Sequence, residues 1–284
     1  MHMMIQDVID VMETHHTRFD PTARTCDGVI VGDPTQECTG VALTCCPTAA
    51  VIRQAAERGC NLVICHEPTF FDGYDAIDWL AGNAVYAAKR ALISQTGVTI
   101  YRNHDHLHSD RPDGIFGGVT RRLGWEPYAL GEALEFMPGC CFELPPTTVG
   151  EVAAHLRGVL HIEGIRIIGD PAMEVTRVGF TFHYSGSEMD KRCIQFIEEN
   201  DMQVIIPGEV VDWTIGEYVQ DALSLGFKRA LLNVGHFNWE EPGMEAMAEW
   251  LSEDLRNGVP VTFIQSGNQY RWIGERLKEG KSWQ

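Results

Sequence analysis

Short apolar runs alternate along the chain with longer segments in which apolar residues recur every three or four positions. The first pattern is typical of buried strands and the second of amphipathic helices. The pattern predicts helices over 4–12, 47–59, 75–97, 114–125, 149–160, 188–202, 216–226 and 242–258. It predicts two short strands within 27–46, with a turn at Asp33-Pro34, and single strands over 61–67, 98–104, 164–171, 175–187, 203–209, 229–236 and 259–266.

Strand and helix alternate through most of the chain, and the strands are continuously apolar. This combination indicates an α/β fold with parallel sheets covered by helices on both faces. Gly82 weakens the predicted helix over 75–97. Pro242 lies near the first turn of the helix over 242–258, where proline is tolerated.

The composition narrows the class of protein. The chain has 284 residues, 44% of them hydrophobic, which is enough for one large domain or two modest ones. The formal net charge of −18 repels phosphate backbones, so general nucleic-acid binding is not expected. A local positive pocket for an anionic small molecule is compatible with this charge.

Cysteine usage and the N-terminal segment indicate a cytoplasmic protein. The nine cysteines include no C-x-x-C pair, which argues against a zinc ribbon or a thioredoxin-like motif, and free thiols fit a reducing compartment. The first residues carry acids and no basic stretch, unlike a signal peptide. No apolar stretch reaches the roughly 18–20 residues of a membrane span, so no membrane partner is expected.

Histidines and carboxylates follow several of the predicted strands. These residues are His66 and Glu67; His104, Asp105, His106 and His108; Glu209; and His236 with Glu240. Ligands of open α/β sheets bind beyond the carboxyl ends of the strands. Imidazoles and carboxylates that converge there are the usual donors of a divalent metal site.

Each of these signals also has a simpler interpretation. A single histidine at a strand end is usually a hydrogen-bonded surface residue, the histidines of 104–108 fit a polar loop, and His236 with Glu240 fits a helix cap. Their joint occurrence at three strand ends favours the metal site. The remaining histidines are assigned structural or surface roles: His2, His15, His16, His155, His161 and His183.

The donors fit one metal ion or two. A carboxylate such as Glu240 is able to bridge two ions, and a two-metal site makes a nucleophile from water at neutral pH. The oxygen ligand Glu67 favours Mn, Fe or Zn over Cu(I).

Several segments, taken in order, resemble a known family. They are "VGDPTQECTGVALT", "GCNLVICHEPTFF", "IYRNHDHLH", "VGFTFHYSGS", "VIIPGE" and "VGHFNWE". They are similar to the VGD…GV, His-His-Pro, His-Thr-Asn-x-Asp, Gly-Ser-Gly, Thr-Gly-Glu and Gly-His-(x)3-Glu stretches of the NIF-three-like dinuclear metal centre proteins. Some members of that family are called GTP cyclohydrolase I type 2 homologues. The resemblance covers nearly the whole chain.

The resemblance implies a ligand for each matching position. His66 matches the first histidine of the His-His pair, and Glu67 falls on the second. His104 falls on the histidine that opens the next motif and His108 on its aspartate. His236 and Glu240 match the last motif directly. The two substitutions are opposite in type, so the totals of imidazoles and carboxylates are kept. Cys65 and His66 could instead be matched to the His-His pair, but Pro68 would then no longer match the proline of His-His-Pro. We therefore match His66 and Glu67 to the pair.

The predicted metal ligands are therefore His66, Glu67, His108, His236 and Glu240, holding two divalent ions (Zn, Fe or Mn). The resemblance also implies two related α/β domains with mostly parallel sheets, the first completed by the C-terminal segment. The expected division is 1–128 plus 228–284 for the domain with the metal site and 129–227 for the second domain. A toroidal homohexamer is expected.

Two classes of function follow. The first is a metal-dependent hydrolase in which His104 or Asp105 orients a ligand or shuttles a proton. Its implied substrates are nucleotides or other phosphate-bearing or cyclic amide compounds, with GTP ring opening as one named reaction. The second is a non-catalytic metal-binding ring that scaffolds, stores or delivers metal, or binds partners, because no unambiguous general acid or nucleophile stands out.

Overall fold

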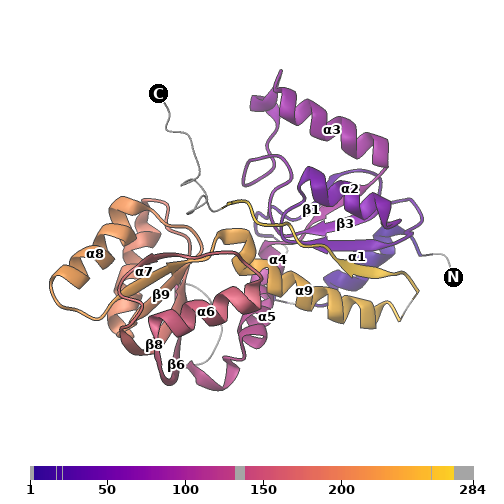
Figure 1. Ribbon diagram of the computed structural model, residues 1–284. Helices are drawn as coiled ribbons and strands as arrows, with labels where there is room; N and C mark the ends of the chain where they lie inside the picture. Colours follow the sequence, from indigo (N-terminus) through magenta and orange to yellow (C-terminus); the bar gives the residue numbers. More distant parts are fainter. Residues whose placement is uncertain (1–2, 17, 21, 132–137, 257, 272–284) are drawn as a thin grey trace, which may run out of the picture.

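The computed structural model describes residues 3–16, 18–20, 22–131, 138–256 and 258–271, and Figure 1 shows its two lobes. His2 lies outside the described residues. Each lobe is built around one sheet. Between the lobes lie α5 (Gly114–Leu123), which follows α4 (Asp105–Ser109), and α9 (His236–Asp254), which precedes β11 (Val261–Phe263).

The first sheet has the strand order β1-β4-β3-β2-β11. Its strands are β1 (Gly28–Val31), β2 (Val41–Thr44), β3 (Leu62–Cys65), β4 (Thr99–Arg102) and β11. Strands β4, β3, β2 and β11 are parallel to one another, and β1 is antiparallel to β4. The helices of this lobe are α1 (Ile5–Glu13), α2 (Ala49–Glu57) and α3 (Ala84–Thr96). The parallel sheet predicted from the alternating pattern is confirmed here.

The second sheet has the order β5-β6-β8-β9-β10-β7. Its strands are β5 (Ala129–Leu130), β6 (Gly139–Thr148), β7 (Arg166–Ile168), β8 (Glu174–Thr181), β9 (Val204–Pro207) and β10 (Ala230–Asn233), and its helices are α6 (Val149–Leu160), α7 (Glu188–Glu199) and α8 (Glu217–Ser224). Only β8, β9 and β10 are parallel to one another, and the outer strands pair antiparallel. This sheet is therefore more mixed than expected.

The strand before His236 belongs to the second sheet. The predicted division placed this segment with the first domain, but β10 pairs with β9 and β7. The reason is local: β9, α8 and β10 form one β-α-β unit, and such a unit places its strands in the same sheet. The chain returns to the first sheet through α9 (His236–Asp254) and β11, which pairs with β2.

Two predicted helices have different limits in the structure. The segment 75–97 is broken, because Gly82 takes a positive φ of 79° and Asn83 caps the new helix by accepting the backbone N–H of Tyr86. A short 3-10 turn, Asp78–Leu80, precedes the break. The last helix begins at His236 rather than Pro242, so the proline lies inside α9.

A buried aromatic group joins the lobes beneath the strand ends. Trp239 of α9 packs edge-on against Phe180 of β8, with ring centroids 4.3 Å apart, and both contact Phe116 of α5 (Gly114–Leu123). These side chains are at most 1% exposed. Gly118 of α5 and Gly243 of α9 let the two helix backbones approach closely. The packing fixes α9 against both lobes.

Among the described helices, none combines the length and the apolar character needed to cross a membrane.

Candidate metal centre

The carboxyl ends of the two sheets deliver imidazoles and carboxylates to one place between the lobes. From the first sheet, His66 and Glu67 follow β3, and His104 and His108 follow β4; from the second sheet, His183 follows β8, Glu209 follows β9, and His236 and Glu240 follow β10. Parallel strands present their carboxyl ends at one edge, which is why each sheet contributes several residues there. We call His66, Glu67, His104, His108, His183, His236 and Glu240 the interdomain cluster.

Ligand atoms within the cluster lie close enough to share metal ions. Three groups have donor atoms within 4.8 Å of one another: His66 with His104 and His108, His66 with Glu67 and Glu240, and His183 with His236 and Glu240. His66 and Glu240 each belong to two groups, so the three groups are continuous. His66 is fully buried, and Glu240 is 1% exposed.

Glu240 is the central carboxylate of the cluster. Its Oε2 atom lies 3.0 Å from Nε2 of His236 and 3.5 Å from Nε2 of His66. Its Oε1 atom lies 3.6 Å from Nε2 of His183. Glu67 approaches the same region, with Oε1 3.2 Å from Nε2 of His236. A carboxylate that faces imidazoles from both lobes has the geometry of a bridging ligand.

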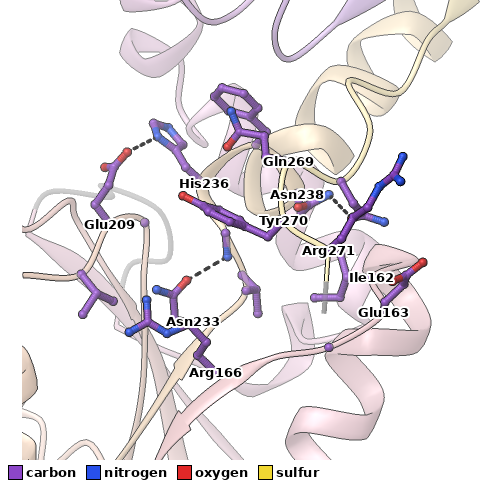
Figure 2. Close-up of a pocket in the computed structure, with 17 residues that line it drawn as sticks. Ile162, Glu163, Arg166, Glu209, Asn233, His236, Asn238, Gln269, Tyr270 and Arg271 are labelled. Atoms are coloured by element: carbon purple, nitrogen blue, oxygen red, sulfur yellow. Dashed lines mark hydrogen bonds and ion pairs between the residues drawn. The ribbon is translucent and has the colours of Figure 1, made fainter. Parts of the chain in front are cut away.

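Every histidine of the cluster has its Nδ1 atom beside an oxygen that only accepts hydrogen bonds. The pairs are His66 with the carbonyl of Asn103 (3.1 Å), His104 with Asp105 (2.8 Å), His108 with Asp113 (2.8 Å), His183 with Glu209 (2.6 Å) and His236 with Glu209 (2.5 Å). Figure 2 shows the contact between His236 and Glu209. In His66, His104, His108 and His236, where the contact is a hydrogen bond, Nδ1 must carry the proton, which leaves the lone pair of a neutral ring on Nε2. The contact of His183 with Glu209 is an ion pair without hydrogen-bond geometry. Metal-binding histidines are held in this way by carboxylates and carbonyls.

The buried donors also fit a cation energetically. Nε2 of His66 has no hydrogen-bond partner among the described residues, and burying such an atom without a partner costs free energy. Burial, together with the neighbouring His104, holds the pKa of His66 well below its ordinary value. His66 is therefore neutral, the form that coordinates metals.

The charged members of the cluster compensate one another. Burial alone would lower the pKa of His236, but Glu240, Glu209 and Glu67 raise it well above its ordinary value. Burial opposes ionisation of Glu240, yet His236 keeps the pKa of that carboxyl well below its usual range. Likewise, burial disfavours a charged His108, but Asp113 outweighs burial and raises the pKa of His108 to about 9. Divalent cations would replace the protons that these imidazoles hold.

The residues predicted to be catalytic divide into two roles. His104 stacks on His66, with ring centroids 4.4 Å apart, and lies among the candidate ligands. Asp105 lies behind it, accepting from Nδ1 of His104 and from the backbone N–H of Cys26 at 3.0 Å. Hydrogen bonding by His104 is the main reason why the pKa of Asp105 is lowered. The geometry thus makes Asp105 a residue that orients His104.

Sequence reasoning missed His183 and left Glu209 out of the predicted set. His183 was assigned a surface role, but its ring centroid lies 4.3 Å from that of His236. Its carboxylate partner, Glu209, contacts both rings. The available signal was position, because His183 follows β8 just as His236 follows β10.

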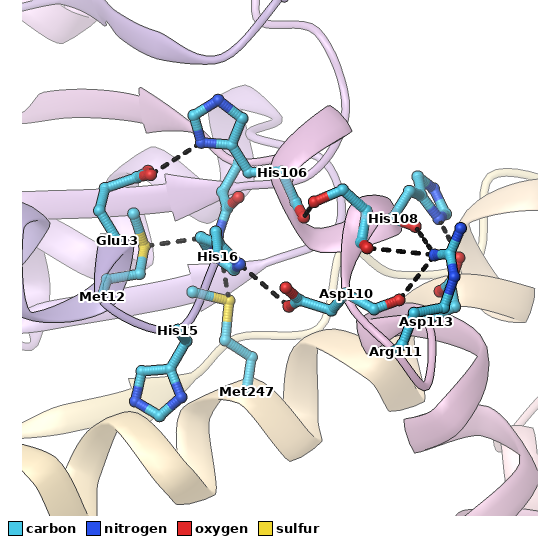
Figure 3. Close-up of polar contacts among 12 residues, drawn as sticks. Met12, Glu13, His15, His16, His106, His108, Asp110, Arg111, Asp113 and Met247 are labelled. Atoms are coloured by element: carbon cyan, nitrogen blue, oxygen red, sulfur yellow. Dashed lines mark hydrogen bonds and ion pairs between the residues drawn. The ribbon is translucent and has the colours of Figure 1, made fainter. Parts of the chain in front are cut away.

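The other described histidines lie outside the cluster. His16 pairs with Asp110 and His106 with Glu13, as Figure 3 shows. His15 pairs with Asp254, Nε2 of His155 contacts the carbonyl of Leu123, and His161 ends α6. Cys65 is fully buried and belongs to none of the groups formed by the described residues. Cys26 forms a further group with His104 and Asp105, but burial raises the pKa of its thiol and keeps it protonated.

The fold and the cluster together define a two-domain α/β protein with a histidine- and carboxylate-rich centre between its sheets. The family model of Duf34/NIF3 (NGG1p interacting factor 3) matches residues 3–269, and the chain belongs to this family.

Individual relatives agree with this assignment. A Clostridium acetobutylicum protein called GTP cyclohydrolase 1 type 2 homolog is 26% identical over 286 residues, which cover 94% of this chain and 97% of that protein. A Staphylococcus aureus protein of the same name is 35% identical over 126 residues, or 43% of this chain and 32% of the relative. The crystal structure of a Bacillus cereus protein related to NIF3 has a TM-score of 0.71 at 15% identity, with 96% and 99% of the two chains covered. A Staphylococcus aureus hypothetical protein gives 0.69 at 18% identity, with 96% and 100% covered. These two structures show the shared fold.

Proposed function

We propose that the chain is a hydrolase that holds two divalent metal ions in the interdomain cluster. The observation that carries the proposal is the common orientation of the histidines, each with Nδ1 directed at an acceptor oxygen. His66, His104 and His108 would hold one ion, His183 and His236 the other, and Glu240 would bridge them. Glu67, predicted as a ligand, would then be free to act on the water. The nitrogen and oxygen donors suit Zn, Fe or Mn. Ions in such a site supply Lewis acidity and make water a nucleophile at neutral pH.

The chain's own residues prepare the site for that chemistry. Asp105, Asp113 and Glu209 fix the ring orientations of the histidines in front of them. Glu67 is 9% exposed and is the cluster carboxylate that lines a cavity next to the cluster. It is placed to take a proton from the attacking water as the new bond to a carbonyl or phosphoryl centre forms. The same proton then passes to the leaving group when the old bond breaks.

The names of the relatives suggest the substrate class. Several are called GTP cyclohydrolase 1 type 2 homolog, and opening the ring of GTP is a hydrolysis. A phosphate-bearing or cyclic amide compound is therefore the proposed substrate. The second candidate is a metal-binding scaffold without catalysis. The number of donors supports it, because the cluster is large enough to fill two tetrahedral shells and leave no open position.

Metal content is the first test. Protein purified without added metal or chelator should contain about two metal ions per chain by elemental mass spectrometry, as a bridged two-metal site requires. The variant with both His236→Ala and Glu240→Ala should contain almost none, whereas His155→Ala should match the wild type. Absence of metal from the wild type would contradict the proposal.

Turnover separates the enzyme from the scaffold. The metal-loaded protein should hydrolyse a member of a panel of nucleotides and cyclic amides, and His236→Ala should abolish that activity while circular dichroism stays unchanged. Turnover retained in His236→Ala would exclude the proposed site. Full metal content without turnover on any substrate would favour the scaffold.

A further inference from the structure

Two cavities border the interdomain cluster and differ in character. The polar cavity, of about 530 Å³, reaches Glu209 and His236. The apolar cavity, of about 460 Å³, reaches Glu67. Phe237 and Gln269 line both cavities, and Figure 2 shows Gln269 beside His236 in the polar one. The two cavities therefore meet at Phe237 and Gln269, and the His236 that lines one lies 3.2 Å from the Glu67 that lines the other.

The polar cavity offers groups that recognise a polar molecule. Arg166 and Arg271 supply positive charge, Tyr270 is 72% exposed, and the amide groups of Asn233 and Asn238 also line the cavity (Figure 2). Guanidinium groups bind anionic oxygens, and amides bind the edges of polar molecules. These features account for the polar part of a substrate but leave the other cavity without a role.

The apolar cavity has a wall of hydrocarbon between α2 and α3. Its apolar lining comes from Ala49, Pro68, Phe71, Val85, Ala88 and Leu92. Phe71 holds a positive φ of 65° and is 53% exposed. A bulky residue in this conformation is a strained position, and such positions cluster at binding sites. An exposed aromatic ring in a strained backbone is a costly arrangement for a surface with no ligand.

One buried cation belongs to the same cavity. Lys89 of α3 is 8% exposed, and its Nζ atom donates to the carbonyl of Thr69 at 2.6 Å. Nζ also lies 5.5 Å from the ring centroid of Phe71. An ammonium has three donors. Within the described residues, no carboxylate comes within ion-pairing distance of Nζ. Lys89 therefore has donors to spare in a mostly apolar cavity, which Arg53 and Glu67 also line.

We propose that the apolar cavity binds an alkyl or aryl group of the substrate, with Lys89 donating to an anionic or carbonyl oxygen attached to that group. The inference rests on the proposed function and specifies its substrate. The substrate joins an apolar acyl or aryl group, in the apolar cavity, to a polar group in the polar cavity. The bond that is cleaved lies between them, next to Glu67 and His236.

Binding of simple carboxylates tests the cavity without requiring turnover. Metal-loaded protein is titrated with acetate and with hexanoate by isothermal calorimetry, and the metal content of the same sample is measured. Each buried methylene contributes about 0.8 kcal/mol, which is roughly a four-fold gain in affinity. Hexanoate should therefore bind at least about ten-fold more tightly than acetate, even with part of the chain exposed.

Adjacent alanines of α3 provide a matched pair of variants. Ala88 lines the apolar cavity and Ala87 does not, although both are exposed helical positions. Ala88→Phe should fill the cavity and remove the preference for hexanoate, whereas Ala87→Phe should keep it. Lys89→Met should weaken acetate and hexanoate to a similar extent and leave their ratio unchanged. Equal wild-type affinities for the two acids, or equal effects of Ala87→Phe and Ala88→Phe, would overturn the inference.

Failure of this inference can be distinguished from failure of the proposed function. A hexanoate preference that Ala88→Phe removes, in protein that contains metal but hydrolyses nothing, would keep the ligand site and reject the hydrolase. Full metal content and turnover with no hexanoate preference would keep the hydrolase and reject the apolar subsite.

Discussion

Nε2 of His66 lies 3.5 Å from Oε2 of Glu240, although the two residues enter the centre from different sheets. His66 follows β3 of the first sheet, and Glu240 lies on α9, which follows β10 of the second. Both are buried. The cluster therefore exists only when the lobes are packed correctly, and metal binding should be coupled to that packing.

The contribution of the second lobe is tested by removing His183. His183→Ala deletes the imidazole that faces Oε1 of Glu240, so metal affinity should fall at least ten-fold and one ion should be lost first during dialysis against a chelator. Elemental analysis after dialysis measures this. His161→Asn is the matched control, because His161 ends α6 in a left-handed conformation that asparagine tolerates. Equal metal retention in His183→Ala and the wild type would remove His183 from the site.

Glu209 should act through the rings that it holds. Burial favours the neutral acid, but His183 and His236 outweigh this and lower the pKa of Glu209 to about 2. Glu209→Gln removes the charge and one acceptor, so metal affinity should fall by about 10- to 100-fold, the usual effect of such second partners. Competition with a fluorescent chelator measures the change. Glu217→Gln, at an exposed position of α8, should have no effect, and a similar loss there would indicate a general charge effect.

The close crossing of α5 and α9 should control both stability and metal binding. A Cβ at Gly118 would lie 2.8 Å from Cα of Gly243 and 3.0 Å from the carbonyl oxygen of Pro242. These are backbone atoms, so α9 must shift. Gly118→Ala should lower the free energy of unfolding by about 1–3 kcal/mol, as overpacking does, and should weaken metal binding through Glu240.

The adjacent glycine of α5 is the control for this prediction. A Cβ at Gly117 would meet Pro112 at 3.7 Å, which is an ordinary contact. Gly117→Ala should therefore preserve or slightly raise the melting temperature, because alanine favours helix. Chemical denaturation of both variants, with metal content measured in parallel, compares them. Equal stabilities would show that the helix crossing is not tight.

Asp190 should make the stability of the second lobe depend on pH. Its carboxylate accepts the backbone N–H groups of Ser185, Gly186 and Ser187 at 3.0–3.3 Å. Burial opposes ionisation, but these hydrogen bonds prevail and lower the pKa of Asp190. Because the folded pKa lies below the unfolded value of about 3.9, the stabilisation is present above that value and is lost as pH falls through the folded pKa.

A pair of amide variants measures this dependence. Asp190→Asn should cost about 1 kcal/mol at pH 7, and the difference from the wild type should shrink below about pH 4. Denaturant unfolding at several pH values gives the comparison. Asp221→Asn, at an exposed position of α8, should follow the wild type throughout. A cost for Asp190→Asn that stays constant down to pH 2 would contradict the assigned role of the charge.

The predicted ligands show how much of the site can be predicted from the local sequence. His66, Glu67, His108, His236 and Glu240 all lie in the interdomain cluster. Each follows a strand whose apolar run is visible in the sequence, and strand ends of an α/β sheet are where ligands bind. The resemblance added the register of the motifs, and it identified the positions of Glu67 and His108 as exchanged in type.

The sequence by itself determined the elements and the strand ends, because apolar periodicity and turn residues act over a few neighbouring positions. Tertiary structure alone decided which edges face each other. His183 gained its role because β8 runs parallel to β9 and β10, and because α9 packs across both lobes. That arrangement depends on contacts between residues far apart in the chain, which no local pattern records. The same long-range packing joined Asp105 to the backbone of Cys26 and placed Lys89 beside the carbonyl of Thr69.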